Sequence, residues 1–335
     1  MDRGNRMTGG KKVGFRILGT GSALPERSVT NDDLSEFLDT SDEWIFPRTG
    51  IRSRGICTTE TLDELAVTAC RRALEAAGVS AGELDLIICS TTSGDHLIPA
   101  EACAVAELIG ASCPAFDLSA ACAGFVFALD VADGYLARGR AERVLVVAAE
   151  KMSRLVDWSD RATCVLFGDG AAAAVLGPDG ENPLAMRLTT EPSVDILHVP
   201  GVAGSSPYDA TDRPASVLAM EGRRVFKFGV NAICDSVQAL CEQAGVAVDD
   251  IDHFVFHQAN ERILSSAVQR LGIDNAKVAR ALEETGNISS ACIPLALDRL
   301  ARAGELKGGQ LVVLVGFGAG LDTGACLLRW DGPGD

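Results

Sequence analysis

The chain alternates short apolar runs with longer segments whose apolar residues recur every three or four positions. Runs such as LDLIICST and RVLVVAAE predict buried β-strands, because they are short, apolar and bounded by turn-forming residues. Segments such as TLDELAVTACRRALEAAG predict amphipathic helices that end at a glycine. Strands are expected at 13–19, 84–91, 114–119, 143–150, 171–177, 254–258 and 310–318, and helices at 61–78, 99–110, 122–139, 225–245, 260–272 and 292–304. This alternation predicts a layered α/β fold.

Two pairs of segments in the chain resemble each other. Residues 73–90 and 240–257 share a helical pattern, a glycine, an acidic loop and an apolar run, at an offset of half the chain. Residues 166–177 and 315–328 share the spacing of two glycines and follow in the same order. Two similarities that occur in the same order along each half of the chain predict a duplicated fold.

The duplication suggests a division of the chain. We expect a flexible tail over residues 1–12, an N-terminal half over 13–185 and a C-terminal half over 186–335. Residues 178–216 are rich in Gly, Pro, Asp and Ser and have weak periodicity, so they are expected to form the connection between the halves and a surface loop.

Charge and cysteine content narrow the function classes. A net charge of −16 over 335 residues argues against non-specific nucleic-acid binding. No apolar stretch is long enough for a membrane span, and the N-terminus lacks the apolar segment of a secretory signal. The 11 cysteines are odd in number, scattered and without a CxxC pair, which favours reduced thiols in the cytoplasm. No metal site is expected, because His253 and His257 lie in a strand-like run without further ligands.

Cys122 is the first candidate for chemistry. An apolar strand ends near Leu118, and a long helix is predicted to begin at the cysteine itself. A thiol at a helix N-terminus is exposed to the positive end of the dipole, which favours its thiolate. The small neighbours in SAACAG would let a substrate approach, and the strand–turn–helix setting is that of a nucleophile elbow. The alternative is a buried structural cysteine.

His257 and Asn287 are the other polar candidates. His257 follows the predicted strand DHFVF, at the strand end where α/β folds place ligands. Asn287 lies between two predicted helices, where it could equally be a turn or cap residue. The glycine-rich stretch GFGAG follows a strong strand and is interpreted as a tight turn or as a source of oxyanion donors.

These residues lie in motifs that resemble one family. From Val13 to Trp330 the sequence is similar to β-ketoacyl-acyl-carrier-protein synthase III, the initiating condensing enzyme of type II fatty-acid synthesis. The motifs that carry the resemblance are, in the family's order, GTGSALPE, TSDEWIFPRTGIRSR, PAFDLSAACAGF, SDRATCVLFGDGAAAAVL, MEGRRVFKFGV, HQANERI, GNISSACIP and GFGAGLDTGA.

The resemblance implies a fold and a mechanism. The fold would be thiolase-like, with duplicated βαβαβαββ halves in an αβαβα sandwich that pairs as a homodimer. Cys122 would be the nucleophile, with His257 and Asn287 completing a triad, and the backbone N–H groups of Cys122 and Gly318 would form the oxyanion hole. An acyl-CoA starter, acetyl or short branched, would condense with malonyl-ACP without a metal or other cofactor.

The resemblance also implies substrate-binding positions. Trp44 and Arg161 match residues that enclose the CoA adenine, Arg48 lies near the nucleotide, and Asn260 orients the substrate. Phe167, Phe317 and Ile98 match the acyl pocket, with Ile98 reaching the partner subunit's site. The basic surface for the acyl carrier protein would consist of Arg262, Lys227 and Arg223.

Some positions depart from the family's pattern, and other functions share the residue types. Ile98 stands where some relatives have Phe, and Asp322–Thr323 replaces a common Thr-Trp pair, so the sequence leaves the identity of the acyl starter open.

The main alternative to an initiating synthase III is a starter-unit ketosynthase or acyltransferase of polyketide or specialised metabolism. A non-catalytic subunit and a Cys/His/Asn hydrolase are the others.

Overall fold

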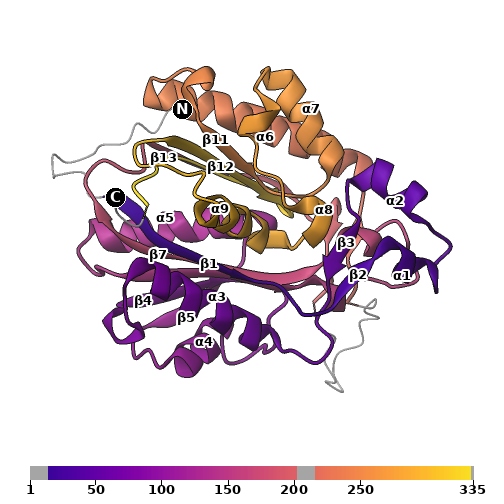
Figure 1. Ribbon diagram of the computed structural model, residues 1–335, viewed down its shortest axis with the longest axis horizontal. Coiled ribbons are helices and arrows are strands. Elements are labelled where there is room, and N and C mark those ends of the chain that lie inside the picture. Colours follow the sequence, from indigo (N-terminus) through magenta and orange to yellow (C-terminus); the bar gives the residue numbers. More distant parts are fainter. Residues whose placement is uncertain (1–13, 202–215, 333–335) are drawn as a thin grey trace.

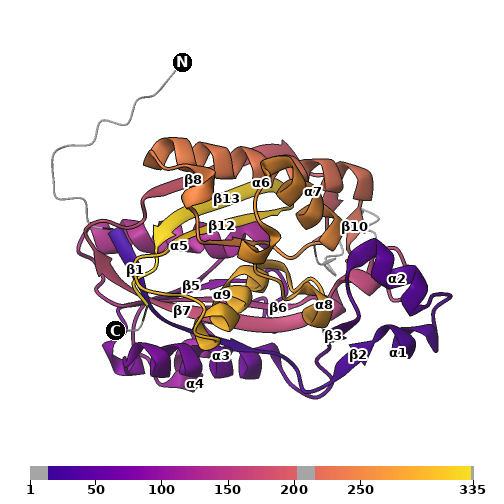
Figure 2. The same cartoon turned by 45° about the horizontal axis from the view of Figure 1, so that its top comes forward.

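The computed structural model describes residues 14–201 and 216–332, which form five stacked layers (Figure 1). Two β-sheets each carry helices on their outer face and share a pair of helices between them (Figure 2). This is the αβαβα arrangement expected from the sequence. The expected tail over residues 1–12 lies outside the described residues. In the described part of the chain, no helix is long and apolar enough to cross a membrane.

The first sheet has five strands in the order β1-β7-β6-β4-β5. These are β1 (Gly14–Ala23), β4 (Leu86–Ser90), β5 (Ala115–Leu118), β6 (Val144–Lys151) and β7 (Asp169–Asp179). Strands β5, β4 and β6 run parallel, whereas β7 is antiparallel to both β6 and β1. Helices α3 (Leu62–Ala77) and α4 (Glu101–Ile109) cover the outer face.

The second sheet has four strands in the order β11-β12-β13-β8. These are β8 (Ala185–Ser193), β11 (His253–Phe256), β12 (Leu311–Gly318) and β13 (Gly320–Arg329). Its outer face is covered by α6 (Gly222–Ala244) and α7 (Glu261–Leu271), seen in orange at the top of Figure 2. Strand β11 is parallel to β12, as β4 is to β6.

Helices α5 (Gly124–Ala137) and α9 (Cys292–Arg302) form the central layer. Both faces of each helix meet a sheet, so apolar side chains are needed nearly all round. Phe125, Leu129, Ile293 and Leu297 are fully buried there. Burial of each such side chain contributes about 1.5–3 kcal/mol to stability. The central layer therefore joins the two sheets through one continuous core.

The duplication predicted from the sequence is present in the backbone. Gly78 and Gly245 both end their helices in the left-handed conformation, and each is followed by a short 3₁₀ turn and then by β4 or β11. A second correspondence lies at the starts of α5 and α9. There, Ala121 and Ser289 both have positive φ, at 45° and 51°, within a turn that leads into the helix.

One part of the expectation is wrong. Residues 185–193, assigned to a connection and loop, form edge strand β8, which pairs with β13. Strand β13 itself lies outside the expected strands, and together with β12 it makes a hairpin at GFGAG. Most residues of β8 are exposed or only partly buried. The strand therefore lacks the continuous apolar run by which a buried strand is predicted. A short antiparallel ladder of β9 (Leu197–His198) and β10 (Ala219–Met220) follows.

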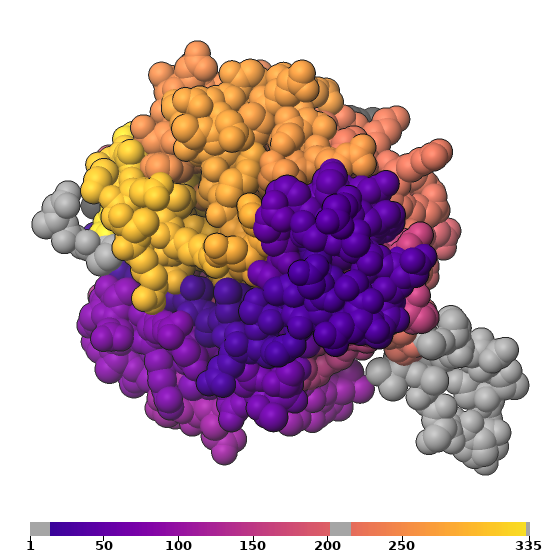
Figure 3. All heavy atoms as spheres, turned by 45° about the vertical axis from the view of Figure 1, so that its right-hand side comes forward, coloured from indigo at the N-terminus to yellow at the C-terminus, as the bar shows by residue number. Residues whose placement is uncertain are grey.

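Residues 28–55 connect the two halves on one side of the molecule. They contain β2 (Ser28–Thr30), α1 (Asn31–Ser35), α2 (Asp42–Thr49) and β3 (Ser53–Gly55). Figure 3 shows this N-terminal segment, in indigo, against the orange C-terminal half. Helix α2 contacts α7, and β3 contacts α8 (Leu282–Thr285). Side chains from α2 and α7 therefore meet beside the active-site region.

Candidate active site

Cys122 lies at a sharp turn between β5 and α5. The preceding residue, Ala121, has φ of 45°, which is strained for a residue other than glycine. A 3₁₀ turn over Ala121–Ala123 then leads into α5 at Gly124. The chain thus reverses direction at the cysteine, as in a nucleophile elbow.

His257 and Asn287 come from the C-terminal half. His257 directly follows β11, where its backbone N–H donates to Val315 O at 2.8 Å. Asn287 lies between α8 and the turn that leads into α9, and its Oδ1 accepts from the Ser289 backbone N–H at 2.9 Å. This contact occupies the amide oxygen, so the amide NH₂ remains available as a donor.

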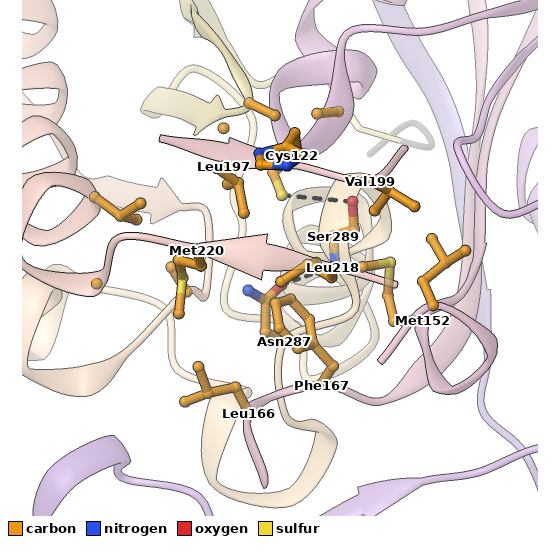
Figure 4. A pocket seen from close by; sticks show the side chains of 18 of the residues that line it. Cys122, Met152, Leu166, Phe167, Leu197, Val199, Leu218, Met220, Asn287 and Ser289 are labelled. Atoms are coloured by element: carbon orange, nitrogen blue, oxygen red, sulfur yellow. Dashed lines mark hydrogen bonds between the residues drawn. The ribbon is translucent and has the colours of Figure 1, made fainter. Parts of the chain in front are cut away.

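The three residues line one cavity of about 1080 Å³, with Cys122, Asn287 and Ser289 shown in Figure 4. Cys122 Sγ lies 3.4 Å from Ser289 Oγ. The remaining wall is largely apolar, and it contains Phe167 and Phe317 from the expected acyl pocket. A cavity with apolar walls and a few convergent polar groups is typical of a ligand site.

Gly318 touches the backbone of Cys122. A Cβ atom at position 318 would lie 2.8 Å from the Cys122 backbone nitrogen and 3.0 Å from its Cβ. Real Cβ atoms do not approach so closely, so glycine is required for the two backbones to meet. The two N–H groups named for the oxyanion hole therefore belong to neighbouring segments.

The expected nucleotide-binding side chains lie in or beside the same cavity. Trp44 and Arg48 from α2 line it, and Arg48 Cζ lies 5.0 Å from the centre of the Trp44 ring. Arg161 Cζ lies at the same distance from that ring, and its guanidinium also binds Asp39. Asn260 also lines the cavity, and its Nδ2 donates to Arg48 O at 3.1 Å. An indole with guanidinium groups close to its ring is a stacking surface for a flat base once a face of the ring is free.

The positions expected to dock a carrier protein line two cavities. Arg223 and Arg262 line the main cavity, and Arg262 also lies over Phe226, with Cζ 5.9 Å from the ring centre. Lys227 lines a separate, more polar cavity beside β8. Ile98 lies outside the main cavity with 87% of its surface exposed. Its neighbour Leu97 lines that cavity.

Burial sets the charge states of the reactive groups. Burial raises the pKa of the Cys122 thiol to about 12, although the hydrogen bond with Ser289 acts in the opposite direction. Loss of solvent around the sulfur thus opposes the effect expected from the helix N-terminus, which favours the thiolate. Burial also lowers the pKa of His257 to about 3, so its imidazole is neutral at physiological pH. Its Nδ1 has no hydrogen-bond partner among the described residues.

Comparisons with known proteins identify the family. A sequence profile of 3-oxoacyl-[acyl-carrier-protein] synthase III matches residues 116–192, and the profile of that family's C-terminal part matches 241–330. The β-ketoacyl-[acyl-carrier-protein] synthase III of Clostridium acetobutylicum is 44% identical over 318 residues, which cover 94% of this chain and 98% of that protein. The chain belongs to the 3-oxoacyl-[acyl-carrier-protein] synthase III family.

Solved structures of synthase III relatives have the same fold. The enzyme from Aquifex aeolicus superposes with a TM-score of 0.87 at 41% identity, covering 95% of this chain and all of that one. The priming β-ketosynthase of the R1128 polyketide pathway superposes with a TM-score of 0.88 at 40% identity, covering 97% of this chain and 99% of that one. The thiolase-like fold expected from the resemblance is confirmed. As a synthase III, the chain is a condensing acyltransferase of fatty-acid biosynthesis.

Several cavity residues of this synthase III were missed from sequence. Leu197, Val199, Leu218 and Met220 line the cavity beside Cys122 (Figure 4). Leu197 and Met220 are paired in the β9–β10 ladder, and Val199 and Leu218 directly adjoin it. The weak periodicity around this ladder indicated a loop. Ser289, which contacts the Cys122 thiol, was missed as well. Its position two residues after the candidate Asn287, in GNISSACIP, was the feature of the sequence that could have indicated a place in the site.

Proposed function

We propose that this synthase III joins a short acyl-CoA starter to malonyl-ACP through an acyl-Cys122 intermediate. The observation that carries the proposal is the meeting of Cys122, His257 and Asn287 in one largely apolar cavity, which Trp44 and three arginines also line. The curated relatives at 44% identity bear the synthase III name, which favours fatty-acid initiation over specialised metabolism.

Acylation comes first. Cys122 gives up its thiol proton, its sulfur attacks the thioester carbonyl of acyl-CoA, and the carbonyl oxygen becomes an oxyanion. The carbon–sulfur bond to CoA then breaks, and CoA takes up a proton and leaves as the thiol. The contact between Gly318 and the Cys122 backbone supports an oxyanion hole made by their two N–H groups. Donors fixed before the reaction stabilise charge that develops in the transition state, and loss of one costs about 10²–10³ in rate.

Decarboxylation and condensation follow. Malonyl-ACP loses CO₂, and the electron pair of the broken bond passes into an enolate whose oxygen lies at the thioester carbonyl. Neutral His257 and the NH₂ of Asn287 donate hydrogen bonds to that oxygen. The carbanion carbon attacks the acyl group on Cys122, the sulfur leaves, and 3-oxoacyl-ACP is released. The thioester carbonyl accepts the charge throughout, so the reaction needs no cofactor or metal.

The arginines of the cavity suit the two carriers. Arg48, Arg223 and Arg262 line it, in a chain with a net charge of −16. Guanidinium groups bind phosphates through paired hydrogen bonds, which supports binding of the CoA nucleotide and then of the ACP phosphopantetheine. We assign adenine stacking to Trp44 and Arg161, which requires Arg161 to move away from the indole. Lys227 extends the basic region toward ACP.

A homodimer completes the proposal. Leu97 and Ile98 expose 85% and 87% of their surfaces on the loop before α4. Adjacent exposed apolar side chains are typical of an interface. We assign this loop to the dimer contact, with Ile98 reaching the acyl pocket of the partner.

The test is a product assay with a panel of starters. Acetyl-, isobutyryl-, hexanoyl- and aromatic acyl-CoA are each supplied with malonyl-ACP, and 3-oxoacyl-ACP is quantified by mass spectrometry. A 3-oxoacyl-ACP product with a short starter, absent in Cys122→Ala, is expected. Release of free acid, or transfer of the acyl group without loss of CO₂, would contradict the proposal.

A further inference from the structure

A fully buried carboxyl group, that of Glu150 in β6, binds residues from both halves of the chain. Its Oε2 accepts hydrogen bonds from Ser93 Oγ at 2.6 Å and from the backbone N–H and hydroxyl of Thr92, both at 3.1 Å. Its Oε1 accepts from Ser290 Oγ at 2.8 Å. Thr92 and Ser93 follow β4, whereas Ser290 lies in the 3₁₀ turn that leads into α9. The carboxyl group therefore ties that turn to the N-terminal half.

The turn that contains Ser290 also carries two residues of the main cavity. Ser289 has φ of 51°, a strained conformation for a residue other than glycine. In that conformation its backbone N–H donates to Asn287 Oδ1 at 2.9 Å, and its hydroxyl lies 3.4 Å from Cys122 Sγ. Figure 4 shows Ser289 next to both side chains. The orientation of the Asn287 amide group therefore depends on the backbone of Ser289.

Glu150 anchors the residue that follows the strained one. Ser290 Oγ lies 2.8 Å from Glu150 Oε1 and 3.2 Å from Ser90 O, so the carboxyl oxygen is its nearer acceptor. The four hydrogen bonds to Glu150 all come from donors, which favours the ionised carboxylate against the effect of burial. A hydrogen bond to an ionised acceptor is roughly twice as strong as one between neutral groups. The contact with Glu150 is therefore the stronger of the two that hold Ser290, and it opposes relaxation of the backbone at Ser289.

We propose that Glu150 is a positioning residue for Asn287, which acts through Ser290 and the Ser289 backbone. This inference rests on the proposed function, in which the Asn287 NH₂ donates to the enolate oxygen. Glu150 holds Ser290, and Ser290 keeps Ser289 in its positive-φ conformation. The Ser289 N–H then holds Asn287 Oδ1, so that the NH₂ is the group presented to the substrate. Glu150 is not among the residues that line the cavity, so it acts through the residues that it holds.

This role affects the two half-reactions differently. Acylation uses the Cys122 sulfur and the backbone donors assigned to Cys122 and Gly318. Condensation also needs the Asn287 donor at a defined place, and a displacement of about 1 Å can cost roughly 10²-fold in rate. Loss of the hydrogen bond between Ser290 and Glu150 should therefore slow condensation and leave acyl loading and the KM for malonyl-ACP nearly unchanged.

The test compares Ser290→Ala with Ser93→Ala as its matched control. Each variant removes one hydroxyl donor to the same carboxylate, but only Ser290 belongs to the turn before α9. In Ser290→Ala, we expect the kcat of condensation to fall about 10–100-fold, with acyl-Cys122 formation within about threefold of the wild-type rate. Ser93→Ala should keep both rates, because the two hydrogen bonds from Thr92 still hold the carboxylate. Urea unfolding should show a loss of stability in both variants.

Glu150→Gln tests the carboxylate itself. The variant keeps the shape of the side chain but replaces one oxygen with an NH₂ group, so it cannot accept from Ser290 and from Thr92 and Ser93 at once. Condensation should fall as in Ser290→Ala. The double variant should be no slower than the slower single variant, because both changes break the same contact.

Three results would overturn the assignment of Glu150. They are wild-type condensation in Ser290→Ala, an equal loss of condensation in Ser93→Ala, and additive losses in the double variant. A wild-type protein that loads acyl-CoA but forms no 3-oxoacyl-ACP would instead refute the proposed function.

Discussion

At the scale of single residues, the proposed mechanism uses His257 and Asn287 as hydrogen-bond donors and not as acids or bases. Burial lowers the pKa of His257 to about 3, so the ring stays neutral and gains no proton near pH 6. Asn287 has its Oδ1 occupied by the Ser289 N–H, which leaves the NH₂ for a substrate oxygen. Both donors suit an oxygen that becomes negative during decarboxylation. Neither is needed for the attack of Cys122 on acyl-CoA.

The first prediction separates the two half-reactions. His257→Ala and Asn287→Ala should load acyl-CoA within about threefold of the wild-type rate but lose condensation by about 10²–10³, because a donor to the enolate oxygen is removed. The two rates are measured as acyl-Cys122 formation and as 3-oxoacyl-ACP formation. His253→Ala, on the same strand, should retain both. Near wild-type condensation by the His257 variant would refute its assigned role.

The second prediction concerns the contact between Gly318 and Cys122. In Gly318→Ala, the new Cβ would lie 2.8 Å from the Cys122 nitrogen, so one of the two backbones must shift and the oxyanion donors with it. Acyl loading should fall by roughly 10² or more. Gly134→Ala is the control, because no atom lies within 4 Å of its Cβ. It should keep full activity and gain about 0.5–1 kcal/mol of stability as a helix-interior alanine. Full loading by Gly318→Ala would contradict the oxyanion assignment.

At the scale of elements, a group of carboxyl side chains joins α3 to the loop before α4. Asp63, Asp95 and Glu101 have oxygens within 4.8 Å of one another. Burial raises the pKa of Glu101 to about 8, and its contact with Asp63 acts in the same direction. Asp95 instead binds Arg154 and the first N–H groups of α3. With a pKa of about 8, the Glu101 side chain is mostly protonated at neutral pH.

The third prediction follows from that raised pKa. In the unfolded chain Glu101 titrates near 4.5, so between pH 5 and pH 8 the folded state binds more protons than the unfolded state. The free energy of unfolding should therefore fall as pH rises through this window, by about 2–4 kcal/mol from this group. Glu101→Gln cannot ionise and should lose this part of the pH dependence.

Urea unfolding of both proteins at pH 5, 7 and 8.5 measures the effect. Glu107→Gln, an exposed position on the same helix, should behave as the wild type. Equal pH dependence in the Glu101 variant and the wild type would show that Glu101 is ionised in the folded state.

The sequence was sufficient for the elements with a one-sided or fully apolar pattern. Helix α3 and strand β4 were predicted because their periodicities, capping residues and C-terminal glycine agree. Strand β8 was not predicted, because this edge strand buries too few residues to show an apolar run in the sequence. The burial of Cys122 was missed for a similar reason. A helix start is visible in the sequence, but the burial that opposes it arises only from the assembled cavity.

At the scale of the whole molecule, the site exists only because two halves of the chain meet. Cys122 comes from the first half and His257 and Asn287 from the second, and α5 and α9 pack side by side between the sheets. The internal repeat predicted this duplication, but spacing along the chain could not show that the three residues share a cavity. The grouping of Trp44 with Asn260 also arises only in three dimensions, from the contact between α2 and α7.

The fourth prediction concerns assembly. Sedimentation should show a homodimer of twice 35.0 kDa. Ile98→Lys should shift the protein toward monomer, because it places a charge in the apolar contact that we assign to the loop before α4. Val194→Lys is the control, since Val194 is 78% exposed elsewhere on the surface. A dimer unaffected by Ile98→Lys, or a monomeric wild type, would contradict the assigned interface.

The central claim is that Cys122 carries the acyl group between two carriers, and one two-stage experiment tests it most directly. The protein is incubated with acetyl-CoA, and the Cys122 peptide is examined by mass spectrometry. Unbound acetyl-CoA is removed, and malonyl-ACP is added. We predict a mass increase of one acetyl group on Cys122 that disappears as 3-oxobutanoyl-ACP and CO₂ form in equal amounts. An unlabelled Cys122 with every starter tested, or an acyl-Cys122 that malonyl-ACP does not discharge, would contradict the account.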